Sequence, residues 1–189
     1  PNTFKVYKQI YDKETGKPVE GLYADLNGDG RITDADLYYY HHASPDWIFG
    51  LSTSLRYKKW TLSTALRSQV GNYLYNGTAA SSGAWESVSW NSGQINNLSS
   101  SFLETNFQCK QYASDYYVEN ASFLKMDNLQ LSYNFGRIRN LFDMHVSAMV
   151  QNVFTVTKYR GVDPESDWGI ENSVYPRPRT YSVTVGLNF

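Results

Sequence analysis

The sequence predicts an all-β chain in which antiparallel strands form part of a transmembrane β-barrel. Three observations support this prediction. Apolar and polar residues alternate along several segments, and these segments have about the length that crosses a bilayer. Short and long connections between the segments follow one another in alternation. A strand with one apolar face places every second side chain on that face, so alternation with a period of two identifies it.

Five segments alternate clearly, and a sixth at residues 3–10 alternates more weakly. The clear segments are Trp47–Tyr57, Trp60–Val70, 123–135, 144–151 and 181–189. In the first segment, Trp47, Phe49 and Leu51 fall on one face, whereas the other face carries mainly small or polar residues. The last segment repeats this pattern and ends in Phe189. We therefore expect about six antiparallel strands, each with an apolar and a polar face.

The segments are close to the 9–11 residues that a tilted strand needs to cross a bilayer. Aromatic residues stand near the ends of the apolar faces, as Trp47 and Tyr57 do in the first segment. Such placement is typical of the aromatic girdles at the two interfaces of an outer-membrane barrel. A soluble β-sandwich would alternate too, but its strands run to about 5–6 residues. Segment length therefore favours the membrane barrel.

The connections between the segments differ in length in a regular order. Residues 58–59 and 136–143 form short connections, whereas residues 11–46, 71–122 and 155–179 form long, polar ones. Bacterial barrels have short periplasmic turns and long extracellular loops, so this order predicts a periplasmic C-terminus. Loops of this length are expected to be functional or mobile.

About six strands can hardly enclose a lumen wide enough to conduct a nutrient. An open sheet in lipid would also leave backbone groups at its edges without hydrogen-bond partners. We therefore expect the strands of this chain to pair with others outside it, as in a piece of a larger barrel.

The composition excludes several other classes. The 189 residues have a formal net charge of -1, which gives no electrostatic reason to expect nucleic acid as a partner. No run reaches the roughly 18 apolar residues of a transmembrane helix. A single cysteine, Cys109, excludes an intramolecular disulfide. Aromatic residues make up 16% of the chain, and their amphipathic rings favour membrane–water interfaces.

A calcium-type loop begins at Asp25 and follows the pattern D-x-[DN]-x-[DN]-G, with an acidic residue at position 12. The candidate ligands are the side-chain oxygens of Asp25, Asn27, Asp29 and Asp36 and the backbone carbonyl of Arg31. A hard cation prefers several oxygens of this kind, so we expect Ca²⁺ in a structural role. An aspartate at position 12 is shorter than the usual glutamate and predicts weaker binding. The alternative is a metal-free turn in which the same residues hydrogen-bond the backbone.

Several further stretches stand out, in order along the chain. They are GKP and YADLNGDG within residues 16–30, SPDWIFG at 44–50, NASFLKMDNL at 120–129, QNVF at 151–154, KYRGVDPE at 158–165 and YPRPRTY at 175–181. Together they resemble the SusC/RagA-like family of TonB-dependent outer-membrane importers. The matches extend over nearly the whole chain. Family members are several times longer, with about 22 strands around a plug. The resemblance implies that residues 1–189 are the C-terminal part of such a barrel, without the plug and most strands.

The same resemblance implies a function in the bacterial outer membrane, in contact with its lipid. It implies an importer of glycans or peptides that works with a SusD-like surface lipoprotein, with the remainder of the transporter chain and, through an N-terminal part outside this chain, with the TonB energy-transducing complex. The sequence does not identify the substrate. The alternative is a small outer-membrane β-barrel for binding or adhesion with a structural calcium loop, which this chain would have to close alone.

No group of residues in the sequence predicts catalysis, and we expect no enzymatic activity. Trp85 and Trp90 lie in a long loop and are weak candidates for stacking on a sugar, although tryptophans in such loops more often pack the loop or a partner interface. The pair Asp163 and Glu165 flanks Pro164, which better suits a turn than hydrolysis.

Overall fold

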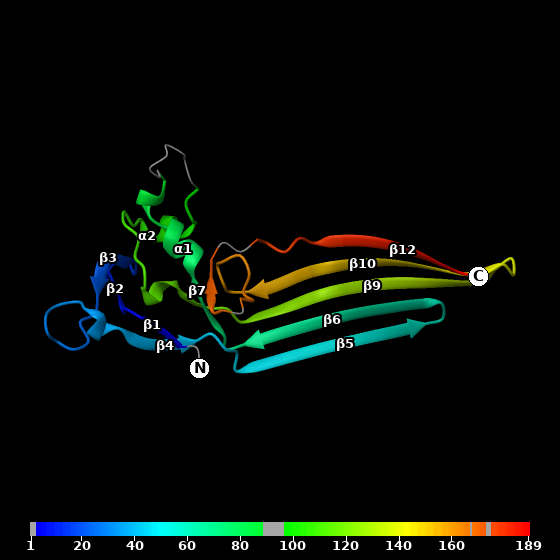
Figure 1. Cartoon of the computed structure of the whole chain (residues 1–189), viewed down its shortest axis with the longest axis horizontal. Helices are drawn as coiled ribbons and strands as arrows, with labels where there is room; N and C mark the ends of the chain where they lie inside the picture. Colours follow the sequence, from blue (N-terminus) through cyan, green and yellow to red (C-terminus); the bar gives the residue numbers. More distant parts are fainter. Residues whose placement is uncertain (1–2, 89–96, 167, 173–174) are drawn as a thin grey trace. The chain divides into compact units, whose positions relative to one another are not determined.

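The computed structural model describes residues 3–88, 97–166, 168–172 and 175–189. The chain forms mostly strands and divides into two compact units (Figure 1). The unit that we call the sheet unit consists of Asp46–Val70, Ser122–Lys158 and Pro176–Phe189. The loop unit consists of Pro1–Pro45, Gly71–Ala121 and Tyr159–Tyr175. No described helix has the length and apolar character needed to cross a membrane.

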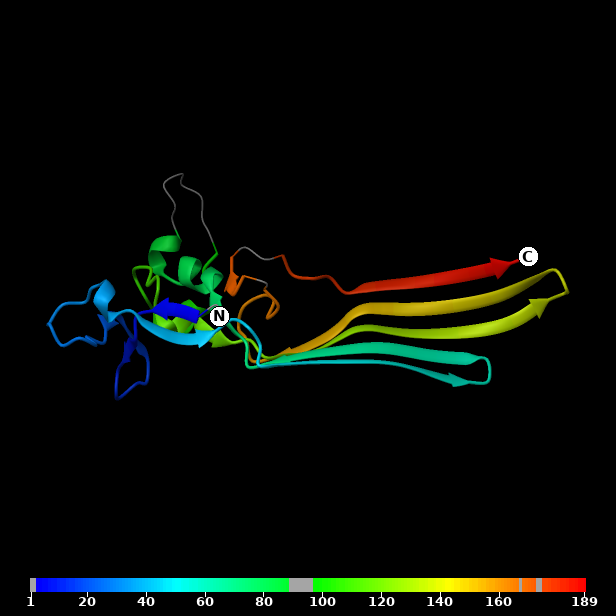
Figure 2. The same cartoon turned by 60° about the horizontal axis from the view of Figure 1, so that its bottom comes forward.

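The sheet unit is one five-stranded antiparallel sheet, whose strands lie side by side in Figure 2. Its strands are β5 (Trp47–Tyr57), β6 (Trp60–Val70), β9 (Phe123–Ile138), β10 (Phe142–Thr157) and β12 (Thr180–Asn188). They pair in the order β12-β10-β9-β6-β5. The five clearly alternating segments are thus confirmed as strands. Within the described residues, β5 and β12 are the two edges, and the sheet does not close on itself.

The register places the apolar residues of all five strands on one face. One row runs directly across the sheet through Leu55, Leu62, Leu131, Ala148 and Val183. Directly opposite residues in an antiparallel pair point to the same side, so this row belongs to one surface. Leu55 is 65% exposed and Val183 74% exposed, which leaves this apolar face uncovered by the chain itself.

The other face of the same sheet is polar. A neighbouring row crosses all five strands through Arg56, Thr61, Ser132, Ser147 and Thr184. The contrast between the two rows follows from the two-residue period of a strand, which separates alternate side chains onto opposite faces. The sheet unit therefore presents one apolar and one polar surface, each continuous from edge to edge.

Aromatic rings gather near the end of the sheet where the short turns lie. Trp60 and Tyr133 meet edge to face with centroids 4.6 Å apart, and Phe135 follows at 4.7 Å from Tyr133. At the opposite end of β5, Trp47 and Phe49 stack with centroids 6.4 Å apart. Aromatic rings thus occupy both ends of the strands, as the sequence pattern predicts for interfacial positions.

The turn between β9 and β10 is shorter than the predicted connection 136–143. Arg139 and Asn140 both have positive φ (47° and 59°), and the Leu141 amide donates to the Ile138 carbonyl at 2.9 Å. Such a turn matches the twist of the flanking strands, so pairing continues to Ile138 and Phe142. Gly136, with φ of 76°, lies at an irregularity inside β9 and not in the turn.

The weak sixth segment at residues 3–10 is not a strand of this sheet. It divides into β1 (Thr3–Val6), which pairs with β4 (Tyr38–His42), and β2 (Gln9–Tyr11), which pairs with β3 (Pro18–Tyr23). The Gln9 amide group holds this arrangement by donating to the Val19 carbonyl at 2.7 Å and the Leu22 carbonyl at 3.1 Å. Local partners in the first long connection therefore satisfy these backbone groups.

The long connections fold together instead of remaining without structure. Besides β1–β4, the loop unit contains β7 (Tyr73–Asn76), β8 (Val118–Asn120), β11 (Ile170–Glu171), α1 (Gly77–Ser82), α2 (Ser101–Thr105) and the 3₁₀ turns η1 (Asp34–Asp36), η2 (Trp85–Ser87) and η3 (Asp115–Tyr117). Its core includes a cluster of Leu74, Ala121 and Tyr159 and another built on Ala79, Ala80 and Tyr117. These apolar residues give the loops a buried interior of their own.

Close packing in the loop unit depends on a glycine at the start of α1. A Cβ atom on Gly77 would lie 2.0 Å from the Asn172 side-chain oxygen and 2.6 Å from the Glu171 carbonyl oxygen. The neighbouring Asn76 caps the helix, because its side-chain oxygen accepts the Ala79 amide at 2.9 Å. β7 therefore ends and α1 begins at Asn76 and Gly77, and β11 packs closely against this point.

Two leucine substitutions test whether the loop unit has a true core. Leu74→Ala removes a side chain that is 1% exposed and should destabilise the loop unit by about 2–5 kcal/mol. Leu103→Ala, at a leucine 82% exposed in α2, should change stability by less than about 0.5 kcal/mol. Native-state proteolysis of the full-length protein measures both. Equal protease sensitivity of the two variants would contradict a packed core.

Candidate functional site

The Asp25–Asp36 turn is held by hydrogen bonds from its own backbone. The two oxygens of the Asp25 carboxylate accept the amides of Gly28 and Gly30, each at 2.7 Å. Further along, the side-chain oxygen of Asn27 accepts the Asp29 amide at 2.9 Å. These are Asx-type turns, in which a side chain replaces a backbone acceptor.

Asp36 closes the turn from the inside. Its side chain is fully buried and accepts the amides of Leu26 and Thr33, both at 2.8 Å. Hydrogen bonding lowers the pKa of the Asp36 carboxyl, and the Thr33 amide makes the largest contribution. The amides of Leu26 and Asn27 and a contact with the Asp25 side chain act in the same direction. The ionised carboxylate therefore organises the turn.

The predicted ligands fit a hard cation by the chemistry of their donors. Asp25, Asn27, Asp29 and Asp36 all lie in this one turn and supply side-chain oxygens. A carboxylate has about four lone-pair sites, so those that accept amides retain further acceptor capacity. Among the described residues, no three His, Cys, Asp or Glu side chains converge as in a metal cluster. The hydrogen bonds are those of the metal-free alternative, and calcium binding stays a prediction.

Arg160 joins two stretches of the loop unit. Its guanidinium pairs with Glu119 at 3.1 Å and with Glu104 at 2.5 Å, and it lies 5.3 Å from the centroid of the Tyr116 ring. The Arg160 amide also donates to Glu119 at 3.0 Å. Sequence reasoning missed this network because its members are distant along the chain. The only early signal was that Arg160 lies in one of the family-like stretches.

Glu171 organises the adjacent stretch from a fully buried position. Its carboxylate accepts the Val162 amide at 2.8 Å and the Thr78 hydroxyl at 3.4 Å. Burial raises the pKa of the nearby Tyr159 hydroxyl, and the negative charge of Glu171 adds to this effect. The family-like residues 159–163 therefore pack around one buried carboxylate.

The carboxyl groups of Asp163 and Glu165 do not form a hydrolytic pair. Asp163 is buried, and its side-chain oxygen accepts the Glu165 amide at 3.1 Å, which is a turn around Pro164. This geometry agrees with the turn role expected from the sequence.

Of the two candidate tryptophans, the structure describes one. Trp85 is 55% exposed at the start of η2, and its ring lies 6.1 Å from the ring of Phe102. It therefore packs partly against α2 and leaves part of its ring at the surface. Trp90 lies outside the described residues.

The role of Asp36 predicts a pH dependence. Because its folded pKa is lowered from 3.8, the carboxylate stabilises the turn fully above pH 3.8, and this contribution is lost as the pH falls through the folded pKa. Asp36→Asn should therefore speed amide exchange at Leu26 and Thr33 near neutral pH, and the difference from the wild type should shrink in acid. Asp34→Asn, at an exposed carboxylate in the same turn, is the control. A difference independent of pH would contradict this role.

Known proteins are similar to this chain over its whole length. It is 35% identical to the TonB-dependent receptor SusC of Bacteroides thetaiotaomicron over 203 aligned residues, covering 100% of this chain and 19% of SusC. The chain is related to the SusC/RagA-like receptors. It is also 28% identical, over 89% of its length, to the TonB-dependent receptor P3 of Formosa agariphila, of which it covers 19%. No protein-family model matches.

Solved structures support the same fold. The RagAB peptide transporter matches 100% of this chain with a TM-score of 0.73 and 24% identity, and the chain covers 23% of that structure. The 'open-open' state of the RagAB peptide importer matches 100% of this chain with a TM-score of 0.74 and 21% identity, and 22% of that structure is covered. The predicted all-β architecture is therefore confirmed.

The relationship also bears on location and class. SusC- and RagA-like receptors are outer-membrane proteins, which confirms the predicted location. These relatives are transporters and not enzymes, in agreement with the predicted absence of enzymatic activity. The chain spans about a fifth of the length of the relatives that it matches.

Proposed function

We propose that this chain is the C-terminal part of the barrel of a TonB-dependent importer, which takes up glycans or peptides together with a SusD-like surface lipoprotein. One observation supports this most directly: the five-stranded sheet has a continuous apolar face and two open edges. Lipid suits the apolar face, and further strands of the same protein suit the edges.

The edges explain why a larger barrel is needed. In lipid, a strand without a neighbour leaves backbone amides and carbonyls without hydrogen-bond partners. Each such group costs several kcal/mol of free energy. β5 and β12 would each need a partner strand, and the relatives are about five times longer than this chain. A small barrel closed by this chain alone, the alternative, would need β5 and β12 to pair with each other.

The remaining partners follow from this proposal. The polar face would line the lumen, and the loop unit would belong to the side of the membrane that carries the long loops. Coupling to the TonB complex would use a part of the protein outside this chain. The name of the RagAB transporter supports peptides as one substrate class, and Trp85 supports stacking on a sugar as another.

The first test is the intact mass of the native protein and the identity of what co-purifies with it from membranes in mild detergent. We expect a mass roughly five times the 21.6 kDa of this chain, together with a lipoprotein. A native protein of 21.6 kDa without a companion would exclude the importer and favour the small barrel.

Charged substitutions on the two faces test the membrane orientation. Leu129→Arg places a charge on the apolar face near the middle of β9 and should cost about 2–4 kcal/mol of folding free energy in lipid. Gln130→Arg places the same charge on the polar face and should cost much less. Urea titration of the full-length protein folded into lipid vesicles measures both costs. Similar costs for the two variants would contradict a lipid-facing apolar surface.

We also propose that the Asp25–Asp36 turn binds Ca²⁺ in a structural role. The donor types support this, and affinity near the 10⁻⁴–10⁻³ M range of extracellular modules is expected. Saturating Ca²⁺ should then protect the turn from proteolysis, by about 2.7 kcal/mol at one hundred times the Kd. EGTA and Asp25→Asn should each remove this protection, whereas Asp143→Asn in β10 should not. Equal protection of both variants would exclude this site.

A further inference from the structure

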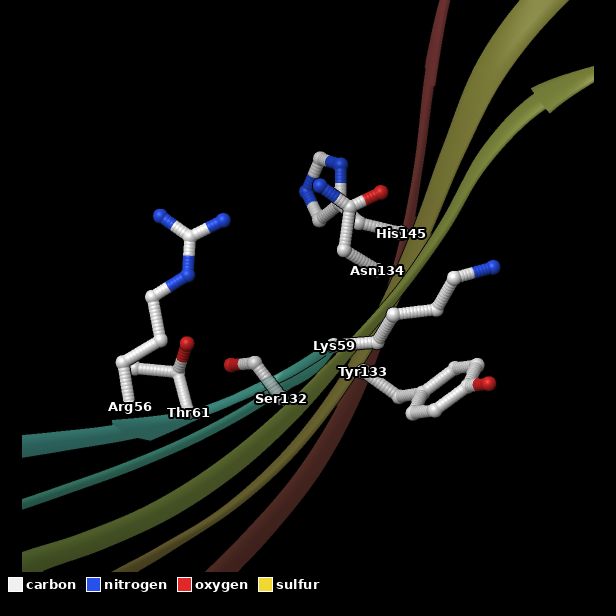
Figure 3. A pocket seen from close by; sticks show the side chains of 7 residues that line it. All are labelled: Arg56, Lys59, Thr61, Ser132, Tyr133, Asn134 and His145. Carbon is white, nitrogen blue, oxygen red and sulfur yellow. The ribbon is translucent and has the colours of Figure 1, made fainter.

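The polar face of the sheet unit contains a pocket near its short-turn end. The cavity has a volume of about 240 Å³. In Figure 3, five lining side chains extend from one side of the strands: Arg56, Thr61, Ser132, Asn134 and His145. Tyr133 and Lys59 point to the opposite side in that view. The pocket thus gathers polar side chains of β5, β6, β9 and β10.

Strand register brings these side chains together. Arg56 lies directly opposite Thr61, Thr61 opposite Ser132, and Asn134 opposite His145. Directly opposed side chains have Cβ atoms about 4.5–5.5 Å apart, close enough to contact one ligand. Backbone pairing therefore fixes the arrangement, because a shift of one residue in any strand would move its side chain to the apolar face.

On β12, a glycine leaves room for the His145 side chain that lines the pocket. Gly186 lies directly opposite His145, and a Cβ atom there would lie 1.9 Å from the Cε1 atom of the imidazole. The histidine ring therefore occupies the space above Gly186. The glycine is required by close approach, which lets the imidazole lie across the neighbouring strand.

The pocket contains hydrogen-bond donors and no acidic side chain. Arg56 offers the five N–H groups of a permanently charged guanidinium, and hydroxyl, amide and imidazole groups surround it. Within the part of the chain that the structure describes, Arg56 forms no ion pair. The Lys59 ammonium donates to the Phe135 carbonyl at 3.2 Å and extends to the opposite side of the strands in Figure 3. On the polar face, Arg56 therefore supplies the positive charge of the pocket.

A second arginine on the same face shows what such a group binds. Arg67 forms a two-pronged ion pair with Asp127, with distances of 2.5 Å from Nε to Oδ2 and 3.0 Å from Nη2 to Oδ1. This fork geometry is the one that arginine prefers for a carboxylate. Arg56 has the same side chain on the same surface, but among the described residues it has no acidic partner.

We propose that this pocket binds one carboxylate, the side chain of an aspartate or glutamate from a segment of the longer protein that packs on the polar face. A single guanidinium matches the single charge of a carboxylate better than the double charge of a phosphate. The relatives are about five times longer than this chain, so most of the protein that could supply the acid lies outside it. The inference rests on the proposed function, in which a larger barrel encloses this face.

Carbodiimide coupling tests the proposal in the full-length protein. Arg56→Lys keeps the positive charge and supplies an amine, which forms an amide with a carboxylate in contact as the carbodiimide takes up the water released. Mass spectrometry should find residue 56 joined to an aspartate or glutamate elsewhere in the protein. Ser54→Lys, on the same face of β5 but outside the pocket, should couple about tenfold less, the preference that one charge-assisted hydrogen bond gives.

An internal control separates failure of this inference from failure of the proposed function. Arg67→Lys should couple to Asp127, because both residues belong to the sheet unit. If residues 67 and 127 couple but residue 56 does not, or if residue 56 couples only to added acetate or no more than residue 54, the inference is overturned. The importer itself is judged separately by mass and partner.

A second variant tests the wall formed by His145. Adding Gly186→Ala to Arg56→Lys should displace the imidazole and lower the coupling at residue 56 several-fold, while coupling between residues 67 and 127 in the corresponding variant is unchanged. An unchanged yield at residue 56 would exclude His145 from the site.

Discussion

The requirement that each backbone amide and carbonyl find a partner governs the sheet unit. In an antiparallel sheet the neighbouring strands supply these partners, and in a bilayer no water can replace them. The register from β5 to β12 follows from this pairing, and from the register follow the two faces. The row through Leu55, Leu62 and Leu131 and the row through Arg56, Thr61 and Ser132 are one residue apart along the strands. The two rows therefore point to opposite faces of the sheet. An exposed apolar surface and a polar pocket are thus two results of one hydrogen-bond pattern.

The loop unit meets the same requirement by different means. Its strands are short and its sheets small, so side chains take over much of the bonding that a long ladder would provide. Asp36 and Glu171 are fully buried, and each accepts several donors. A buried carboxylate is unfavourable unless it is hydrogen-bonded, so these two residues fix the backbone around them while they are themselves stabilised by it.

The sequence was sufficient for features that depend on neighbouring residues. Alternation located the five strands of the sheet, because side-chain direction repeats every two residues. It made the β9–β10 connection too long, because a glycine with positive φ serves equally in a turn or at an irregularity in a strand, as Gly136 does. The alternation could not show that the Gln9 side chain donates to backbone carbonyls of β3. Together with strand pairing, these contacts hold residues 3–11 against β3 and β4 and not in the long sheet.

The candidate sites also differ in whether their residues are neighbours in the sequence. The Asp25–Asp36 turn was recognisable because all its members lie within twelve consecutive positions. The Arg160 network and the pocket around Arg56 were not, since their members come from strands and loops that only the folded topology brings together. Arg160 and Glu104, for example, are 56 residues apart. No local pattern encodes such a contact.

The two units alternate along the chain, and this has a consequence for the order of folding. The loop unit draws on three stretches that are separated by strands of the sheet unit, and the hydroxyl of Ser114 bonds the Gln9 side chain across 105 residues. A nascent or newly exported chain therefore cannot complete the loop interior until the stretch that begins at Tyr159 has emerged. Contacts of such high sequence separation slow folding, because the entropy of closing each intervening loop is lost before the contact forms. β6 likewise lacks one of its two neighbouring strands until β9 has been made, so an unpaired strand edge is exposed for that period.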